Sequence, residues 1–222
     1  MATLENGRKP GKRVAQGIRS RDKLLRVAAR RFSERGFSAT SIDDVCHDTG
    51  VVKSALYWHF ENKEGLLTAV LEQAAEAFEE TAAAWIHDIV SDVTTSNDPR
   101  ERLRRAVLGM RNIIETKSAM IRLMHGILLD GTGFNKKTRA IIMRVYDRVR
   151  DALIEGIAEA IEARPAGLDS IALLILSVLN GAFFATQLRR DPKELDKIFA
   201  ELEQAILLLV GSVVQGSSEA RG

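Results

Sequence analysis

The chain has 222 residues, of which 45% are hydrophobic and 28% are charged. This balance is that of an average soluble globular protein, and it excludes a chain that is disordered throughout, because disorder needs low hydrophobicity and a large net charge. The single cysteine, Cys46, excludes an internal disulfide and fits a reducing compartment, so we expect a cytoplasmic protein. Aromatic residues make up 5% of the chain, which favours helices over a β-sandwich.

The net charge of +2 conceals an uneven distribution of charge along the chain. Residues 1–63 carry 13 basic and 7 acidic side chains, whereas residues 64–222 carry 19 basic and 23 acidic ones. A basic segment attached to an acidic body indicates that the basic segment binds a polyanion. The alternative, on charge alone, is a charged surface that contacts only solvent.

Apolar residues recur at three- and four-residue spacing along most of the chain, which is the period of amphipathic helices. Gly36 and Gly50 follow two such segments and are expected to end helices, while Ser41 with Asp44 has the spacing of a capping box. We therefore predict an all-α fold of about nine helices, at residues 19–35, 42–49, 52–60, 63–93, 99–117, 118–129, 134–164, 169–190 and 193–214.

One of these predicted helices has nearly the length of a membrane span, because the 19 residues from Ser170 to Leu188 contain no charged side chain. Several polar or small residues interrupt the segment and would be costly in lipid: Ser170, Ser177, Asn180, Gly181, Thr186 and Gln187. We therefore expect a helix of a soluble protein that is buried on most sides. The first twenty residues contain no apolar stretch, so we expect no signal peptide.

Residues 41–60 have the pattern of a helix-turn-helix motif. Two short predicted helices are joined by Thr49-Gly50-Val51, and two helices at a steep angle need such a tight turn. On the second helix, Val52, Leu56 and Phe60 recur at four-residue spacing, and we expect them to anchor it to a small core.

The opposite side of this short helix carries Lys53, Ser54 and Tyr57, with Ala55 and His59 on its flank. A short polar face of this size fits the major groove of DNA, which is about as wide as a helix. Lys53 can donate to a guanine edge or to a phosphate, and Tyr57 and His59 can donate to phosphate oxygens, which set register without specifying sequence.

Lys63 stands at the expected start of the following helix, where a cation opposes the helix dipole. The position is explained if Lys63 and the free backbone N–H groups of that helix terminus together hold a phosphate. An exposed lysine without a partner is the alternative.

The run TSIDDVCHDTGVVKSALYWHFENKEGLL, from Thr40 to Leu67, resembles the DNA-binding signature of TetR-type (TetR/AcrR family) transcriptional regulators, and FSERGF from Phe32 to Phe37 fits the same signature. The resemblance covers roughly residues 19–70. It implies that the family's DNA contacts fall here on Thr40, Ser41, Lys53, Ser54, Ala55, Tyr57, His59 and Lys63.

Two positions depart from the family's pattern. Val52 stands where a Ser or Thr often caps the recognition helix, which puts one contact to a backbone phosphate in doubt. Ala55 stands where Thr is frequent, so that a hydroxyl is missing but a methyl group remains to contact a thymine methyl.

The residues and the resemblance together suggest four segments. Residues 1–17 are a flexible basic arm that either enters the minor groove or only aids solubility, and residues 18–64 are the DNA-binding domain. Residues 65–215 are a helical domain for effector binding and dimerisation, and residues 216–222 are a flexible tail.

The resemblance implies a homodimer formed by the last two helices, which pair with those of a second subunit in a four-helix bundle. These two helices offer apolar residues for such a contact, although burial within one chain is a serious alternative for the first of them. The apolar residues are Ile171, Leu174, Ile175, Val178, Leu179, Ala182, Ile206, Leu209, Val210 and Val213.

An effector pocket is expected among the helices of the middle region, where most of the methionines lie, and methionine adapts to varied ligands. The expected pocket residues are Met110, Ile114, Met120, Leu123, Met124, His125, Leu128, Met143, Tyr146, Phe183, Phe184 and Gln187. Most of them are also expected to serve simply as core. The sequence does not identify the effector, which we expect to be largely apolar.

Signatures of catalysis were sought and not found in the sequence. It has no G-x-S-x-G, H-E-x-x-H or C-x-x-C pattern, and its 4 histidines are too scattered to suggest a metal site. We therefore expect no enzyme, metal or cofactor, and a repressor that an effector releases from a palindromic operator. The alternative is a helical carrier of small molecules without a DNA function, which would leave the basic first 63 residues unexplained.

Overall fold

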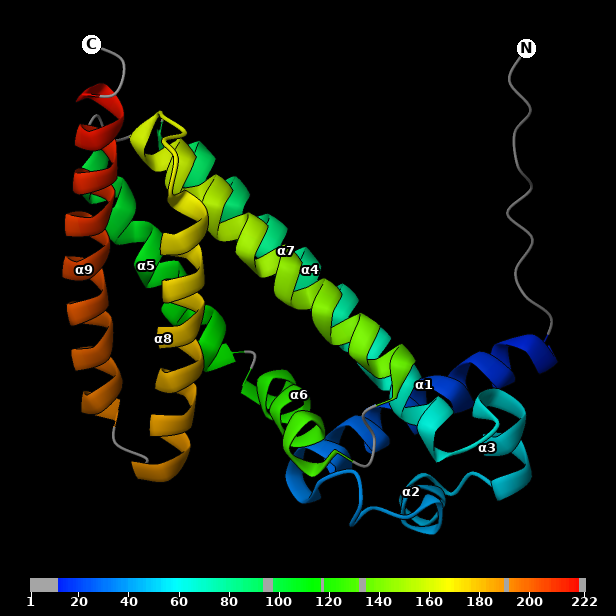
Figure 1. Ribbon diagram of the computed structural model, residues 1–222. Coiled ribbons are helices and arrows are strands. Elements are labelled where there is room, and N and C mark those ends of the chain that lie inside the picture. The colour runs from blue at the N-terminus through cyan, green and yellow to red at the C-terminus, as the bar shows by residue number, and fades with distance from the viewer. Residues whose placement is uncertain (1–11, 94–97, 117, 132–134, 190–191, 220–222) are drawn as a thin grey trace, which may run out of the picture. The chain divides into compact units, whose positions relative to one another are not determined.

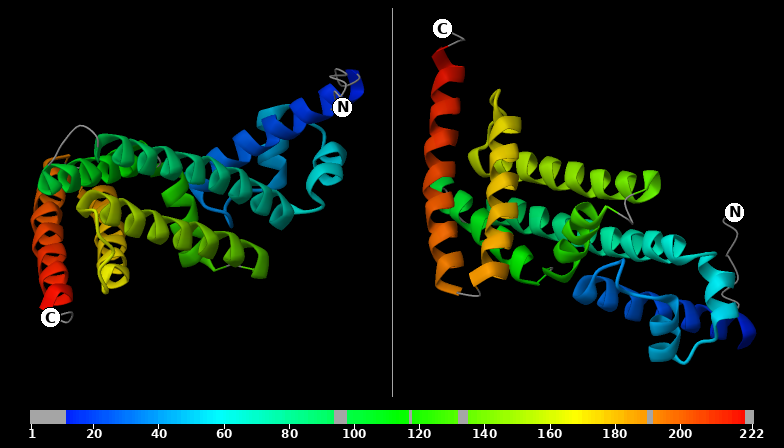
Figure 2. Two further views of the ribbon diagram at one scale, coloured as in Figure 1. Left: turned by 90° about the horizontal axis from the view of Figure 1, so that it is seen from above. Right: turned by 60° about the horizontal axis from the view of Figure 1, so that its bottom comes forward.

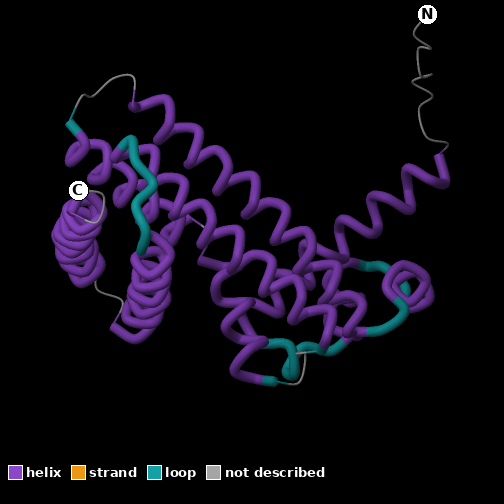
Figure 3. The backbone as a smooth tube through the Cα atoms, turned by 45° about the horizontal axis from the view of Figure 1, so that its top comes forward, coloured by secondary structure: helices purple, strands orange, loops and turns teal. Residues whose placement is uncertain are grey.

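The computed structural model describes residues 12–93, 98–116, 118–131, 135–189 and 192–219, and within these ranges it contains helices and no strands (Figures 1 and 3). The all-α prediction is therefore confirmed. The helices are α1 (Lys12–Arg35), α2 (Ile42–Thr49), α3 (Lys53–Phe60), α4 (Lys63–Val93), α5 (Pro99–Thr116), α6 (Ser118–Asp130), α7 (Lys136–Ile161), α8 (Leu168–Arg189) and α9 (Pro192–Glu219).

Two helices extend beyond the predicted bounds. Helix α1 begins at Lys12, so residues 12–17 of the expected flexible arm are helical, because good helix formers continue backward from Arg19 with only Gly17 among them. Helix α9 continues to Glu219, into the expected flexible tail. Residues 1–11 of the arm and 220–222 of the tail lie outside the described residues.

The chain forms two compact units. The first unit comprises residues 1–73 and 122–139, and the second comprises residues 74–121 and 140–222. This division differs from a boundary at residue 64, because the first turns of α4, the second half of α6 and the start of α7 pack with α1, α2 and α3.

The first unit has a small hydrophobic core to which each of its helices contributes. The stripe on α1 predicted from the sequence is buried, with Leu24, Leu25 and Ala28 fully covered. Side chains from the other helices complete the core: Val45 from α2, Leu56 and Phe60 from α3, Leu66, Leu67 and Val70 from α4, and Leu123 and Ile127 from α6. Each fully buried leucine stabilises the fold by about 1.5–3 kcal/mol relative to an exposed one.

Helix α2 is held at both ends and against α1. Ser41 and Asp44 form the expected capping box, in which the Ser41 hydroxyl accepts from the Asp44 N–H at 3.1 Å. Asp48 accepts two hydrogen bonds from the Arg31 guanidinium, at 2.7 and 2.8 Å, and a third from Arg30 at 3.1 Å. These bonds hold the pKa of Asp48 down to about 2, first through the hydrogen bond from Arg31.

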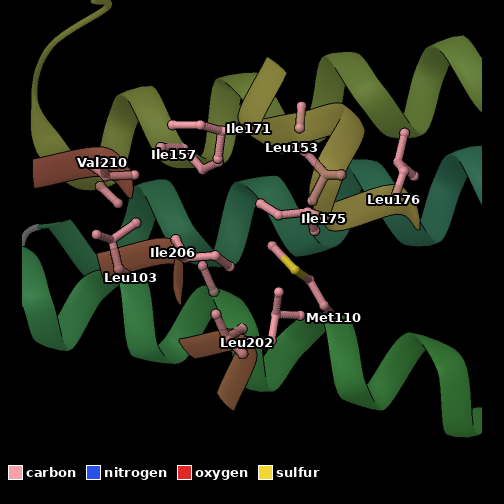
Figure 4. Packing of buried hydrophobic residues seen from close by; sticks show 14 of the residues in the cluster. Leu103, Met110, Leu153, Ile157, Ile171, Ile175, Leu176, Leu202, Ile206 and Val210 are labelled. Carbon is pink, nitrogen blue, oxygen red and sulfur yellow. The ribbon is translucent and has the colours of Figure 1, made fainter. Parts of the chain in front are cut away.

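The core of the second unit lies between α5, α7, α8 and α9 (Figure 4). Helices α8 and α9 lie side by side in both views of Figure 2, and α5 packs on α9. Arg102 of α5 is buried beside this core, where its Nε donates to the Ala160 carbonyl at 2.7 Å and its Nη1 pairs with Glu162 at 2.8 Å. A buried guanidinium is tolerated because these partners replace the water it loses.

Two helices, α8 and α9, are long and apolar enough to span a membrane by length and composition alone, over Leu168–Leu188 and Lys193–Gln215. Both contribute to the core of the second unit, as expected for α8. The expectation that α8 is buried on most sides is wrong for a single chain, because Leu173, Leu174 and Leu188 are exposed. One face of α8 therefore has no cover from its own chain.

Gly65 in the first turn of α4 should resist substitution. A Cβ there would collide with the Phe60 carbonyl oxygen and lie 3.1 Å from its carbonyl carbon, both fixed in the backbone of α3. We expect Gly65→Ala to lower the free energy of unfolding in urea by about 1–3 kcal/mol. In most helix positions the same substitution raises stability, because alanine favours the helix more than glycine does. Gly126→Ala in α6, where nothing lies within 4 Å, is the matched control and should stabilise by about 0.5–1 kcal/mol. Equal effects of the two changes would contradict the close contact.

The Arg31–Asp48 contact should make stability depend on pH. Because the pKa of Asp48 is lowered from 3.8 to about 2 in the folded state, its contribution is complete above about pH 4 and disappears as the pH falls toward 2. We expect Arg31→Gln to move the Asp48 pKa back toward 3.8 in an NMR titration of the carboxyl carbons. An unchanged titration of Asp48 in this variant would show that Arg31 does not cause the shift.

Candidate nucleic-acid interface

Helices α2 and α3 form a helix-turn-helix with a short, well-bonded turn. Gly50 adopts a left-handed conformation with φ of 65°, and its N–H donates to the His47 carbonyl at 3.3 Å. The buried Thr49 hydroxyl donates to the Val45 carbonyl at 2.8 Å and accepts from the Val51 N–H at 3.3 Å. These bonds fix the direction in which the chain enters α3.

Helix α3 has one buried side and one exposed side. Leu56 and Phe60 are buried, as predicted, and Lys53, Ser54 and Tyr57 are exposed. The prediction that Val52 anchors the helix is wrong, because its side chain is 67% exposed. Val52 is the N-cap residue with extended backbone, so it precedes the helix and does not follow the helical period.

Lys53, the first residue of α3, forms an ion pair with Asp43 on α2, and this contact raises the pKa of Lys53 through the hydrogen bond to the carboxylate. Ser54 and Tyr57 are exposed on the same helix, and Ala55 is half-buried. The exposed side of α3 therefore includes a row of polar groups with a lysine–carboxylate pair at its N-terminal end.

His59, at the other end of α3, lies 3.0 Å from the hydroxyl of Ser20 on α1, measured from Nε2 to Oγ. Burial lowers the pKa of His59 below its usual value, which favours the neutral imidazole. The half-buried ring also packs edge-on against Trp58, with centroids 4.8 Å apart. His59 thus joins α3 to α1 and presents only part of its surface.

Lys63 is held in place by the turn between α1 and α2. Its Nζ lies 4.3 Å from the centroid of the Phe37 ring and donates to the Ser38 carbonyl at 3.4 Å. The terminus of α4 beside it is capped by Asn62, whose side-chain oxygen accepts from the Gly65 N–H at 2.7 Å. The alternative of a lysine without a partner is therefore not what the structure shows.

The two residues before α2 serve the fold more than the surface. Thr40 is 1% exposed, and its hydroxyl donates to the Gly36 carbonyl at 2.9 Å, so its side chain does not belong to the exposed surface on which a DNA contact was expected. Ser41 is exposed but engaged in the capping box of α2. The periodic pattern did not show this, because both residues precede the helix.

Three nearby residues were missed by the sequence reasoning. Trp58 is 80% exposed on α3, and its place four residues after Ser54 on the polar row could have indicated this. Asp43 contacts Lys53 across the turn. Asp130, at the end of α6, accepts from the Ser38 hydroxyl at 2.6 Å, and no sequence signal marks a contact between residues so far apart.

The predicted effector residues are distributed over both units. Leu123, Met124, His125 and Leu128 belong to the first unit, and the second holds Met110, Met120, Met143, Tyr146, Phe183, Phe184 and Gln187. Met110, Leu123 and Phe183 are buried, whereas Leu128, Met143, Phe184 and Gln187 are exposed. The side chain of Ile114 lies outside the described residues. The pocket therefore stays a prediction.

Comparison with known proteins points to one family. Residues 24–70, which span the second half of α1, all of α2 and α3, and the start of α4, match the model described as bacterial regulatory proteins, tetR family. The chain is 26% identical over 142 residues to the probable acrEF/envCD operon repressor of Escherichia coli K12, covering 56% of this chain and 60% of that protein. It is 27% identical to the transcriptional activator FasR of Mycolicibacterium smegmatis, over 85% of this chain and 82% of that protein.

Solved structures share the fold. The reduced form of E. coli NemR matches with a TM-score of 0.68 and 16% identity, covering 84% of this chain and 96% of that one. A TetR-family regulator from Mesorhizobium loti matches with a TM-score of 0.70 and 17% identity, covering 87% of this chain and 98% of that one. The match to the E. coli repressor spans about 60% of that relative's length. Residues 24–70 of the chain therefore carry the helix-turn-helix signature of the tetR family of bacterial regulatory proteins.

Proposed function

We propose that the chain is a homodimeric transcriptional repressor that binds a palindromic DNA operator through α3 and is released by a small, largely apolar effector. The observation that carries the proposal is the exposed polar side of α3, held by Leu56 and Phe60 on a firmly bonded turn. The basic charge of residues 1–63 supports the same partner, because phosphates dominate the affinity for DNA.

In this proposal α3 lies in the major groove and supplies the contacts to base edges through Lys53, Ser54 and Ala55. Tyr57 and Lys63 contact phosphates and fix the register of the helix on the duplex. Lys63 suits this role because the Phe37 ring and the Ser38 carbonyl hold its ammonium group beside the N-terminus of α4, which itself attracts anions. In this proposal the side chain of Thr40 does not contact DNA, because it is buried. The only side-chain group that Ser41 could offer to DNA is the hydroxyl that already caps α2.

The exposed faces of α8 and α9 support the proposed dimer. Ile171, Ile175, Ala182, Ile206 and Val210, which the sequence offered for a contact between subunits, are instead buried in the core of their own chain. Leu174, which the sequence also offered, is exposed, and the other exposed apolar residues of these helices are Leu173, Phe184, Leu188, Leu208 and Val214. A soluble monomer seldom leaves so much apolar surface uncovered, so pairing with a second copy is the natural cover.

Effector release requires that the effector bind one conformation of the protein better than the other. Helix α6 is a suitable element for this, because it begins in the second unit and ends in the first, where Asp130 accepts from both the N–H and the hydroxyl of Ser38 at 3.3 and 2.6 Å. Ser38 in turn holds Lys63. A change at the end of α6 would thus reach a proposed phosphate contact through two hydrogen bonds.

Repression is proposed over activation because two of the relatives described here are named as repressors and one as an activator. The two repressors are the probable acrEF/envCD operon repressor and KstR2, a repressor of M. smegmatis that is 28% identical over 108 residues. FasR is named as an activator. Transcription in vitro from a promoter that overlaps the selected operator distinguishes the two outcomes.

Removing the proposed phosphate contacts should weaken DNA binding whatever the sequence. We expect Lys63→Ala to lower affinity about tenfold for both a duplex selected from a random pool and an unrelated duplex, and to reduce the salt slope by about 1. Tyr57→Phe should weaken both without changing the slope, because it removes a hydroxyl and no charge. Arg148→Ala, which removes a charge from the exposed part of α7, is the control.

Two results would count against this assignment. Unchanged affinity in both the Lys63 and the Tyr57 variants would show that these residues do not contact DNA. A wild-type protein that selects no duplex from the pool would leave the carrier protein without a DNA function as the better explanation.

The dimer can be tested with one substitution on α9. Leu208 is 75% exposed in the single chain, and we expect Leu208→Asp to convert the dimer to a monomer in native mass spectrometry, because a buried, unpaired carboxylate is costly. Leu129→Asp places the same charge on an exposed leucine of α6 and should leave the dimer intact. A wild-type protein that is monomeric at micromolar concentration would contradict the proposal.

A further inference from the structure

We propose that Asp43 and Lys53 act together as one specificity-determining unit that selects a G·C base pair in each half-site of the operator. The inference rests on the proposed function and adds to it a residue of α2 that the sequence did not single out. The base pair that these two side chains would recognise is G·C.

The contact joins the first turn of α2 to the first residue of α3. The Lys53 Nζ and the Asp43 Oδ1 form an ion pair, and both side chains remain more than half exposed, at 56% for Lys53 and 66% for Asp43. The pair therefore lies at the surface, on the end of α3 that precedes Ser54, where a duplex in contact with the helix would meet both groups.

The other carboxylates of α2 are engaged with α1 and leave Asp43 as the one that faces α3. Asp48 pairs with Arg31 at 2.7 Å, and Asp44 caps the helix and lies 3.6 Å from Arg31. Asp43 precedes Asp44 by one residue, which turns its side chain by about 100° around the helix axis. The two faces of α2 thus carry acids with different partners.

An acid at this position is unfavourable for unspecific DNA binding. Its charge repels phosphates and neutralises Lys53, which would otherwise add a phosphate contact and release a counterion. A carboxylate that only weakened binding would have no purpose on this surface. The arrangement is explained if the pair improves discrimination between sequences.

The donors and acceptors of the pair match one base pair. A lysine ammonium has three donors, of which one goes to Asp43, so two remain for bases. In the major groove a G·C pair presents two neighbouring acceptors, N7 and O6 of guanine, followed by the N4 donor of cytosine. Lys53 can donate to the two acceptors while Asp43 accepts from the cytosine amino group. An A·T pair places a donor between its acceptors and fits this order less well.

A purely structural role for Asp43 makes a different prediction. A carboxylate in the first turn of a helix is stabilised by the positive end of the helix dipole. If Asp43 served only this purpose, its removal would lower the melting temperature and leave the relative affinities for different duplexes unchanged. Discrimination between base pairs is therefore the measurement that separates the two roles.

The experiment measures dissociation constants of the full chain for three duplexes: the selected operator, the operator with G·C replaced by A·T at one symmetric position, and an unrelated sequence. For the wild-type protein we expect the replacement at one such position to cost about tenfold in affinity. In Asp43→Asn we expect this cost to fall below about threefold, while affinity for the unrelated duplex rises and its salt slope steepens by about 1.

Two further variants show whether Asp43 acts through Lys53. In the background of Lys53→Ala the Asp43→Asn change should have no further effect on discrimination, since the two residues form one unit. Glu80→Gln, on an exposed part of α4, removes the same charge and should leave discrimination unchanged. Asp43→Ser retains a residue favoured at helix N-termini and should repeat the result of Asp43→Asn without loss of melting temperature.

The inference is overturned if Asp43→Asn keeps the tenfold preference, or if the preference is lost equally in Glu80→Gln. Either result leaves the proposed function standing, provided that the wild-type protein still selects a palindromic duplex. Failure of the wild-type protein to select any duplex overturns the proposed function and the inference with it.

Discussion

The arrangement of the DNA-binding surface depends on the burial of two side chains of an eight-residue helix. Leu56 and Phe60 of α3 are buried where this helix packs on α1 and α2, and an isolated helix of this length is not stable in water. Their burial therefore both keeps α3 helical and decides which residues remain outside. Lys53, Ser54 and Tyr57 are exposed as a result of this packing and of the bonded turn at Gly50.

Much of this could be predicted from the sequence, because the helical period of apolar residues is strong in α1 and α2. The stripe on α1, the capping box at Ser41 and the exposed row of α3 all follow from local spacing, and each is found in the structure. The period fails where a residue precedes its helix. Val52 and Thr40 are both such positions: Val52 is exposed although the spacing on α3 predicted that it is buried, and Thr40 is buried although the resemblance implied a DNA contact there.

Contacts between distant segments could not be predicted in this way. The bond between Ser38 and Asp130 joins residues 92 positions apart, and the Asp43–Lys53 pair depends on the angle at which α2 meets α3. The sequence also did not show which faces of α8 and α9 are buried within the chain. Composition shows that a helix is apolar, but not which of its faces packs against other helices of the same chain. The isoleucines of α8, Ile171 and Ile175, lie inside and three of its leucines, Leu173, Leu174 and Leu188, lie outside, although all five side chains are similarly apolar.

The corner between α3 and α4 has a consequence for how the surface could move. Only Glu61 and Asn62 separate the two helices, Glu61 has a positive φ of 63°, and its N–H donates to the Tyr57 carbonyl at 2.9 Å. The backbone of Gly65 also approaches the Phe60 carbonyl so closely that it leaves no room for a Cβ between the two helices. Helices α3 and α4 are thus joined by a short, closely packed corner, and we expect a tilt of one helix to be passed on to the other.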